Sequence, residues 1–185
     1  MENIRSKTNI IRNKHKELGF KNILEDIEKS IEDFGIKVLY SDMSTFDFPD
    51  SISGYSRINE IGVPEIVVNV RHTSGRRRFT MAHELGHILL HWGWPQPNLD
   101  KEYSILYRNE YSSDANTQME NEANEFAAQL LVPLDILEKV LPQPIDSYTK
   151  DDMDILAGKV AKAFKISKPF AWRQLDKLKR EKGGV

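Results

Sequence analysis

The chain has 185 residues, 39% of them hydrophobic, which is enough to bury one sizeable core with at most a small additional lobe. It carries 26 Lys and Arg against 28 Asp and Glu, and a net charge of −2 argues against a broad surface for phosphate backbones. It has no cysteine, no signal-like N-terminus and no apolar run of about 18 residues, so we expect a cytoplasmic protein without disulfides, thiolate metal sites or membrane spans.

The first elements predicted along the chain are helical. A polar helical segment is expected over about residues 8–18, and a helix with one apolar stripe over 22–34. Asn22, with Glu25 three residues later, is typical of a capping box, and Gly35 is a typical helix stop. A strand is then predicted over 36–40.

A hairpin is predicted next, after a loop rich in Asp, Ser and Phe. Its strands would cover about residues 53–59 and 65–70, with a turn at Gly62, Val63 and Pro64. Together with the strand at 36–40, the hairpin predicts a short antiparallel sheet.

The most informative element is a helix predicted over 76–92, with Thr73 or Ser74 as its N-cap. His83 and His87 are four residues apart, so they lie one turn above each other on one helix face and could bind a single ion. Glu84 lies about 100° around the helix, where its carboxylate could reach a water on that ion. Two neutral imidazoles suit zinc, so this pattern predicts a catalytic zinc site with Glu84 as the base.

Two other residues of this helix bear on the site. Gly86 costs about 1 kcal/mol relative to Ala in a helix interior, which is reasonable where another backbone must come close. His91 lies on the same polar stripe, but a continuous helix would carry it one further turn away from the two ligands. A role in supporting a ligand, in facing the substrate or in structure alone therefore stays open for His91.

The third metal ligand is expected on a second helix, after a long polar loop over about residues 93–115. The apolar face of this helix is formed by Met119, Ala123, Phe126, Ala127, Leu130 and Leu131. Glu120 falls within that arc, whereas Glu122 falls on the solvated side. A carboxylate in an apolar face needs a partner, so Glu120 is the predicted ligand and Glu122 the reserve, although Glu120 could also be a partly exposed helix glutamate. Asn124, one turn on, is expected to hydrogen-bond a metal ligand.

The C-terminal part is predicted to be helical. Pro133 either ends the preceding helix or opens a short one over 134–140, and two more helices are expected over about 151–164 and 167–182. The last two resemble a helix-turn-helix with a small core, made of Ala161, Phe164, Ile166, Ala171, Leu175 and Leu178. Asp176 and Glu181 interrupt the basic face of the final helix, so direct nucleic-acid binding is not expected.

Several segments together resemble one known family. They are residues 66–69, 78–87, 120–128 and 130–133, with 52–54 upstream and Ala161, Phe164, Ile166 and Ser167 downstream. The combination is similar to the ImmA/IrrE family of zinc metallopeptidases. The resemblance implies zinc on His83, His87 and a glutamate of the second helix, with Glu84 as catalytic base. The order Glu-x-x-Ala-Asn is also similar to the Glu-x-x-Ala-Asp of other gluzincins, whose first glutamate is the ligand.

The resemblance also implies a biological role. Members of this type, often encoded by phages and integrative elements, cleave the helix-turn-helix repressor encoded beside them, and others cleave repressors of stress responses. We therefore expect a cytoplasmic zinc endopeptidase whose partner is a protein substrate, a transcriptional repressor. The alternative is a zinc-stabilised DNA-binding or protein-interaction regulator without protease activity.

The expected architecture is a single α+β domain over 1–185. It comprises a zincin-like metallopeptidase core at about 1–140 and a helix-turn-helix-like lobe at about 150–185. Residues 65–70 are expected to be an edge strand that pairs with an extended substrate. The donor that stabilises the oxyanion stays open among His72, His91, Tyr103, Tyr107 and Tyr111.

Overall fold

The computed structural model describes residues 3–95 and 114–183. The chain divides into two compact units, Met1–Leu130 and Leu131–Val185. The first combines helices with a three-stranded sheet, so the fold is α+β as expected. Among the described residues, no helix is both long and apolar enough to cross a membrane.

The first unit opens with short helices, α1 (Ile4–Lys14), a 3₁₀ turn (Lys16–Leu18), α2 (Phe20–Glu25) and α3 (Ile27–Asp33). The prediction of one helix over 22–34 was wrong, because Asp26 has an extended backbone and its side chain caps α3 by accepting from the Lys29 amide. The capping box at Asn22 was wrong too: Asn22 lies inside α2 and donates to the Lys16 carbonyl. Gly35, with φ of 98°, follows α3 as predicted.

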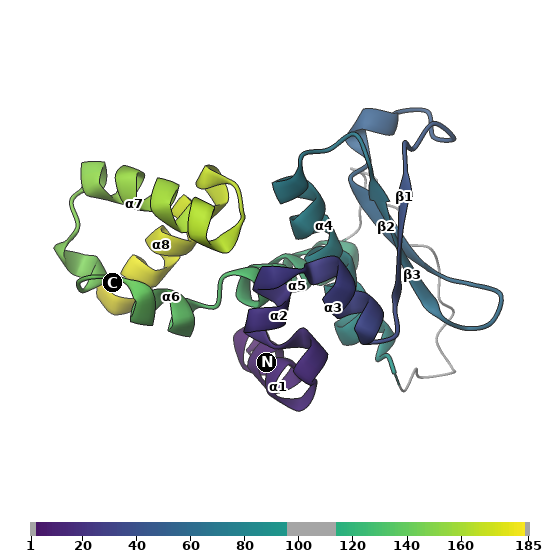
Figure 1. Cartoon of the computed structure of the whole chain (residues 1–185), viewed down its shortest axis with the longest axis horizontal. Coiled ribbons are helices and arrows are strands. Elements are labelled where there is room, and N and C mark those ends of the chain that lie inside the picture. Colours follow the sequence, from purple (N-terminus) through teal and green to yellow (C-terminus); the bar gives the residue numbers. More distant parts are fainter. Residues whose placement is uncertain (1–2, 96–113, 184–185) are drawn as a thin grey trace. The chain divides into compact units, whose positions relative to one another are not determined.

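The sheet consists of β1 (Lys37–Ser41), β2 (Gly54–Ile58) and β3 (Pro64–Asn69), in the order β1-β3-β2. β2 and β3 form the predicted antiparallel hairpin, but β1 runs parallel to β3. The expectation of an antiparallel sheet was therefore wrong, and the sheet is mixed. β3 was also expected to be an edge strand, yet it lies between the other two and all its residues are buried. Figure 1 shows α3 and α4 on the same face of this sheet.

Glycine at position 54 permits close packing where β2 begins. A Cβ there would lie 2.5 Å from Cγ2 of Thr80 and 2.6 Å from the Val67 carbonyl oxygen. Any larger residue would push β2 away from α4 and β3. This close approach matters because β2 carries a residue that contacts the candidate site.

The helix α4 (Ser74–Gly86) begins after Thr73, whose hydroxyl accepts from the Arg76 amide, as expected of an N-cap. The helix was predicted to continue regularly to Trp92, but residues His87–Trp92 form a π-helical turn instead. Gly93, with φ of 76°, ends it. This change of winding moves His91 relative to the position that a regular α-helix would give it.

The long helix α5 (Asp114–Leu131) packs against α4. A Cβ on Gly86 would lie 3.1 Å from Cδ1 of Phe126 and 3.2 Å from Cα of Ala123, so the expected close approach of another backbone at Gly86 is confirmed. The core of the first unit contains fully buried apolar side chains, among them Ile31, Ile66, Val68, Leu85, Ile88 and Phe126.

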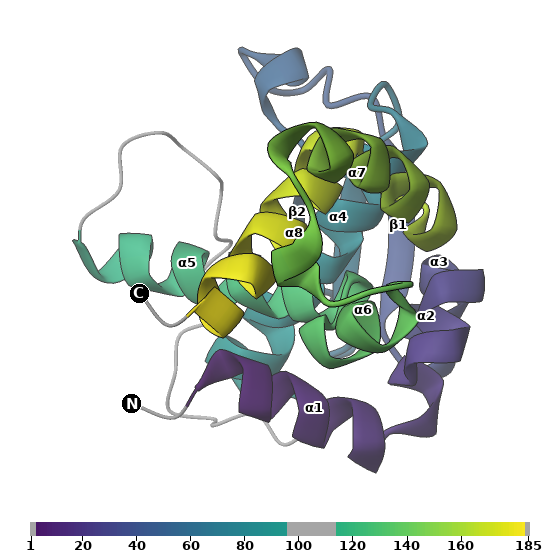
Figure 2. The same ribbon diagram turned by 90° about the vertical axis from the view of Figure 1, so that its left-hand side faces the viewer.

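The second unit comprises α6 (Leu134–Val140), a 3₁₀ turn (Ile145–Ser147), α7 (Lys150–Phe164) and α8 (Lys168–Gly183). Pro133 is the N-cap residue of α6, which decides between the two predicted roles of this proline. α7 begins with a capping box between Thr149 and Asp152 and ends at Lys165, whose backbone is left-handed. Figure 2 shows α6, α7 and α8 gathered together. The predicted small core is buried except for Ile166, which is half-buried, and Phe170 is buried beside it. The likeness to a helix-turn-helix stays a prediction.

Candidate metal centre

Three predicted ligands meet between α4 and α5. The Nε2 atoms of His83 and His87 lie 3.0 Å apart. The Glu120 carboxylate reaches both rings, with Oε2 3.3 Å from His83 Nε2 and Oε1 3.1 Å from His87 Nε2. The two histidines are only 1% and 2% exposed. Among the described residues, this is the group of His, Asp and Glu side chains that could hold a metal ion.

The orientation of His83 is set from α5. Its Nδ1 lies 3.0 Å from Oδ1 of Asn124, the residue one turn after Glu120. With the ring proton on Nδ1 and donated to that oxygen, the lone pair of Nε2 is available to a cation. Asn124 was expected to hydrogen-bond a metal ligand, and the ligand that it contacts is His83.

The donor set fits a metal ion. Ligands about 2.0–2.2 Å from a tetrahedral ion lie about 3.3–3.6 Å from one another, close to the observed separations of 3.0–3.3 Å. Two buried imidazole rings and the half-buried carboxylate of Glu120 converge, and a cation between them would satisfy all three. Burial of Glu120 opposes its ionisation, but without a cation the protons donated from the Nε2 atoms of His83 and His87 and the charge on those rings outweigh burial and lower the pKa of the Glu120 carboxyl. A metal ion would take the place of those protons between the two rings and the carboxylate.

Glu84, the predicted base, lies beside this group and is 4% exposed. Ser56 of β2, which is fully buried, donates from Oγ to Glu84 Oε2 over 2.8 Å. The sequence interpretation missed Ser56. The signal for it was present, because Gly54, Ser56 and Ile58 alternate along the strand and so share one face, and a serine on an inward face needs a polar partner.

Glu122 and His91 meet next to the ligand group. Nδ1 of His91 lies 2.9 Å from Nδ1 of His87, and its Nε2 lies 3.3 Å from Oε2 of Glu122. Gln118 donates to the other oxygen of that carboxylate over 2.9 Å. His91 is not among the three residues that could hold the ion, and it contacts the ring of His87 instead, which fits the supporting role that the sequence left open for it. Glu122 contacts neither His83 nor His87 in this arrangement, which leaves Glu120 as the glutamate between them.

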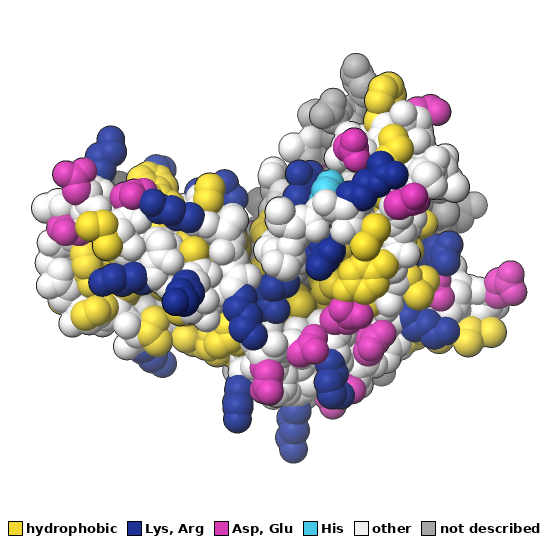
Figure 3. All heavy atoms as spheres, turned by 45° about the horizontal axis from the view of Figure 1, so that its top comes forward, with side chains coloured by type: hydrophobic (Ala, Val, Ile, Leu, Met, Phe, Trp, Pro, Cys, Tyr) yellow, Lys and Arg dark blue, Asp and Glu magenta, His cyan; other side chains and the backbone are white. Residues whose placement is uncertain are grey.

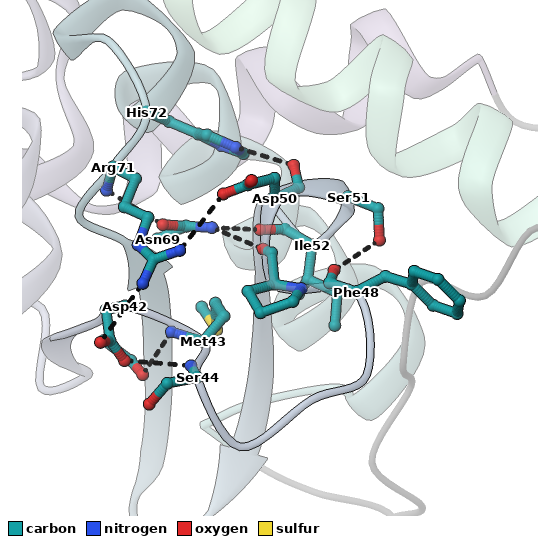
Figure 4. Close-up of polar contacts among 12 residues, drawn as sticks. Asp42, Met43, Ser44, Phe48, Asp50, Ser51, Ile52, Asn69, Arg71 and His72 are labelled. Carbon is teal, nitrogen blue, oxygen red and sulfur yellow. Dashed lines mark hydrogen bonds and ion pairs between the residues drawn. The ribbon is translucent and has the colours of Figure 1, made fainter.

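Of the remaining candidates for the oxyanion donor, only His72 lies within the described residues. His72 lies after β3, with Nε2 3.3 Å from the Asp50 carbonyl oxygen (Figure 4). Tyr103, Tyr107 and Tyr111 lie outside the described residues. The donor therefore stays open.

The loop that leads into β2 is fixed to the end of β3. The buried Asn69 donates from Nδ2 to the carbonyls of Pro49 and Ile52, over 2.9 and 2.8 Å (Figure 4). Its Oδ1 accepts from the Arg71 amide, and the Arg71 side chain pairs with Asp50. This network sets where β2 begins, and with it where Ser56 meets Glu84.

Comparison with known proteins agrees with the resemblance found in the sequence. The model of the peptidase M78 family, described as the IrrE N-terminal-like domain, matches residues 31–175. No curated protein matches the chain. The matched segment includes both helices of the candidate metal centre, all three strands and most of the second unit. The chain therefore belongs to the peptidase M78 family, the metallopeptidases of the ImmA/IrrE type.

Proposed function

We propose that this protein is a zinc-dependent endopeptidase that cleaves a specific intracellular protein, a helix-turn-helix transcriptional repressor. One observation carries the proposal: the half-buried Glu120 converges with the buried His83 and His87, and the buried Glu84, next to His83 in the chain, is in contact with Ser56. A purely structural metal site has no use for a carboxylate base at that position. The repressor as substrate rests on the resemblance to the ImmA/IrrE family.

In this mechanism His83, His87 and Glu120 hold the ion. Bound zinc supplies a Lewis acid, which lowers the pKa of a coordinated water and polarises the scissile carbonyl. Glu84 takes the proton of the attacking water and returns it to the leaving amine. Ser56 donates to Oε2 of Glu84, so we assign the proton transfer to the other carboxylate oxygen, Oε1.

The substrate is proposed to bind along β2. β3 cannot accept a further strand, because β1 and β2 already pair with its two sides. β2 pairs with β3 on one side only, and no described strand pairs with its other side. Since Ser56 of β2 contacts Glu84, a peptide added to this edge would run past the candidate base.

The alternative of a DNA-binding regulator receives less support from the surface. Lys and Arg side chains are interspersed with Asp and Glu on the face shown in Figure 3. Several cations of the second unit are paired with acids: Lys168 with Asp154, Arg180 with Asp176 and Lys182 with Glu138. A surface that binds a phosphate backbone needs cations that are available to the phosphates.

The decisive experiment uses Glu84→Gln, which keeps the size of the side chain but removes the base. Zinc-loaded wild type and variant are incubated with the product of the adjacent gene and with a proteome-derived peptide library. New N-termini are then identified by mass spectrometry. We expect cleavage by the wild type, a loss of orders of magnitude in the variant, and one zinc per chain in both.

Two controls complete this experiment. Glu120→Gln should lower the zinc content, because it replaces the anion between the two histidines. Zinc-free wild type, or equal cleavage by wild type and Glu84→Gln, would contradict the proposal. If Glu84→Gln relieved repression fully in cells without cleaving anything, the regulator without protease activity would be correct.

A further inference from the structure

We propose that Glu122 and His91 form a positioning pair that fixes the ring of His87 for metal binding. This inference rests on the metal-binding role of His87 proposed above and extends it to two residues that are not ligands. The structure places the three side chains in one line of contacts, from the Glu122 carboxylate through the His91 ring to the His87 ring.

If His87 binds a metal through Nε2, the ring protons of His87 and His91 have one arrangement that satisfies these contacts. His87 Nε2 faces His83 and Glu120, so it needs its lone pair for a cation, and the single ring proton lies on Nδ1. That proton is donated to Nδ1 of His91 over 2.9 Å. His91 then carries its own proton on Nε2 and donates it to Glu122 Oε2 over 3.3 Å. The carboxylate thereby selects the tautomer of both rings.

The contact between His87 and His91 lies within a π-helical turn of the backbone. In an α-helix, His91 would lie a full turn and about 40° beyond His87. The π-helical turn His87–Trp92 has more than four residues per turn, so His91 falls short of a full turn and the two Nδ1 atoms meet. Such turns are rare and concentrate at functional sites. The far end of the line is also fixed, because Gln118 donates to Glu122 Oε1 over 2.9 Å.

The two ligand histidines are thus supported differently. His83 donates to a neutral amide oxygen of Asn124, whereas His87 is linked to an anion through a second imidazole. His91 and Glu122 are half-buried, with side chains 9% and 29% exposed, so solvent screens this link only in part. Loss of the pair should therefore weaken metal binding without removing a ligand.

The first test measures zinc affinity by competition with a chelator, with no substrate present. Glu122→Gln should lower the affinity about tenfold and keep one zinc per chain. The matched control is Glu125→Gln, which removes the same charge from α5 at a carboxylate that accepts from Gln129. We expect the control to remain within about twofold of the wild type. Equal losses in the two variants would overturn the proposal, because they would show a general charge effect.

A double-mutant cycle separates action through His91 from direct action of the Glu122 charge. If Glu122 acts through His91, then Glu122→Gln should cause no further loss of affinity in a His91→Leu background. The same tenfold loss in both backgrounds would overturn the positioning role. The cycle compares affinities only, so its outcome does not depend on whether the protein cleaves any substrate.

The tautomers can be read in the unsubstituted protein, which avoids any variant that fails to fold. Long-range ¹H–¹⁵N spectra of the zinc-loaded chain should show His87 protonated on Nδ1 and His91 protonated on Nε2. A proton on Nδ1 of His91 would overturn the proposal. A protein that binds zinc with these tautomers but cleaves nothing would leave the positioning pair standing and refute only the peptidase activity.

Discussion

At the scale of single residues, the contact between Ser56 and Glu84 links the sheet to the candidate base. Both side chains are buried, and the hydroxyl donates to one carboxylate oxygen only. A hydrogen bond to a carboxylate restricts its rotation. Ser56 therefore bears on how Glu84 is presented, while it has no contact with the three ligand atoms.

The first prediction concerns Ser56→Ala. We expect kcat/KM for the identified substrate to fall about tenfold, because Glu84 loses the contact that orients it, with zinc affinity unchanged. The matched control is Ser53→Ala, which removes another buried serine hydroxyl that accepts from Arg76 instead. The control should lower stability without lowering kcat/KM of the folded protein. Equal kinetic losses in the two variants would refute the role of Ser56.

Helix phase alone predicted much of this site. Residues four apart on one helix face share a neighbour, so His83, His87, Glu120 and Asn124 could be assigned by counting. Ser56 could not be assigned in that way, because its contact depends on how closely β2 approaches α4 at Gly54. The π-helical winding of His87–Trp92 was not predicted, because the sequence offers no rule for such a turn, so the three roles left open for His91 could not be reduced to one.

At the scale of elements, the crossing of α4 and α5 at Gly86 brings the ligands of the two helices together. The Ala123 backbone lies so close that a Cβ on Gly86 would meet it at 3.2 Å. Glu120 is one turn before this crossing on α5, and His83 and His87 flank it on α4. The separation of the helices at this point therefore sets the separation of the ligands.

The second prediction follows for Gly86→Ala. Alanine is more favourable than glycine in a helix interior by about 1 kcal/mol. At this position, however, the added Cβ must push α5 away, so we expect the free energy of unfolding to fall by about 1–3 kcal/mol and zinc to bind more weakly. Gly158→Ala in α7 is the control, because a Cβ there meets nothing within 4 Å. It should raise the free energy of unfolding by about 0.5–1 kcal/mol. Chemical denaturation of both variants checks this, and Gly86→Ala matching Gly158→Ala would contradict it.

The third prediction concerns Glu65, a buried glutamate in the central strand. It accepts from Arg57 Nε over 2.8 Å and from Asn59 Nδ2 over 3.1 Å. Burial opposes its ionisation, but these hydrogen bonds and the charge of Arg57 outweigh burial and lower its pKa. Because the pKa is lower in the folded state, Glu65 stabilises the fold above its unfolded pKa, and this contribution disappears as the pH falls through the folded pKa.

Glu65→Gln should therefore lower the free energy of unfolding by about 1 kcal/mol at pH 7, and the difference from the wild type should shrink in acid. Urea unfolding of chelator-treated proteins at pH 7 and near pH 3.5 measures both values without a contribution from zinc release. A difference that is the same at both pH values would show that ionisation of Glu65 does not contribute.

The order of the strands was the part of the fold that the sequence could not supply. The hairpin was predicted because its turn is local and contains glycine and proline. The parallel pairing of β1 with β3 connects segments far apart in the chain, and no short pattern specifies it. That one pairing converts β3 from an expected edge strand to the central strand and makes β2 the candidate edge for substrate.

At the scale of the whole molecule, the metal ligands belong to one of the two units. His83, His87 and Glu120 all lie within Met1–Leu130, whereas α6, α7 and α8 lie within Leu131–Val185. The matched family segment nevertheless extends over both units. Metal binding should therefore stabilise one unit directly, and any effect on the other must pass through coupled unfolding.

The last prediction tests this division by removing the metal. We expect the buried apolar core to hold the fold without the ion, so chelation should abolish cleavage and leave a cooperatively folded protein. Free zinc at 100 times its dissociation constant should add about 2.7 kcal/mol to the free energy of unfolding of the first unit. Amides that exchange only when this unit unfolds should then exchange about 100-fold more slowly. Hydrogen exchange read by mass spectrometry should show this slowing in α4 and α5 but not in α7 and α8. Equal slowing in α7 and α8 would show that the chain unfolds as one cooperative body, and loss of the cooperative transition on chelation would show that the metal is structural.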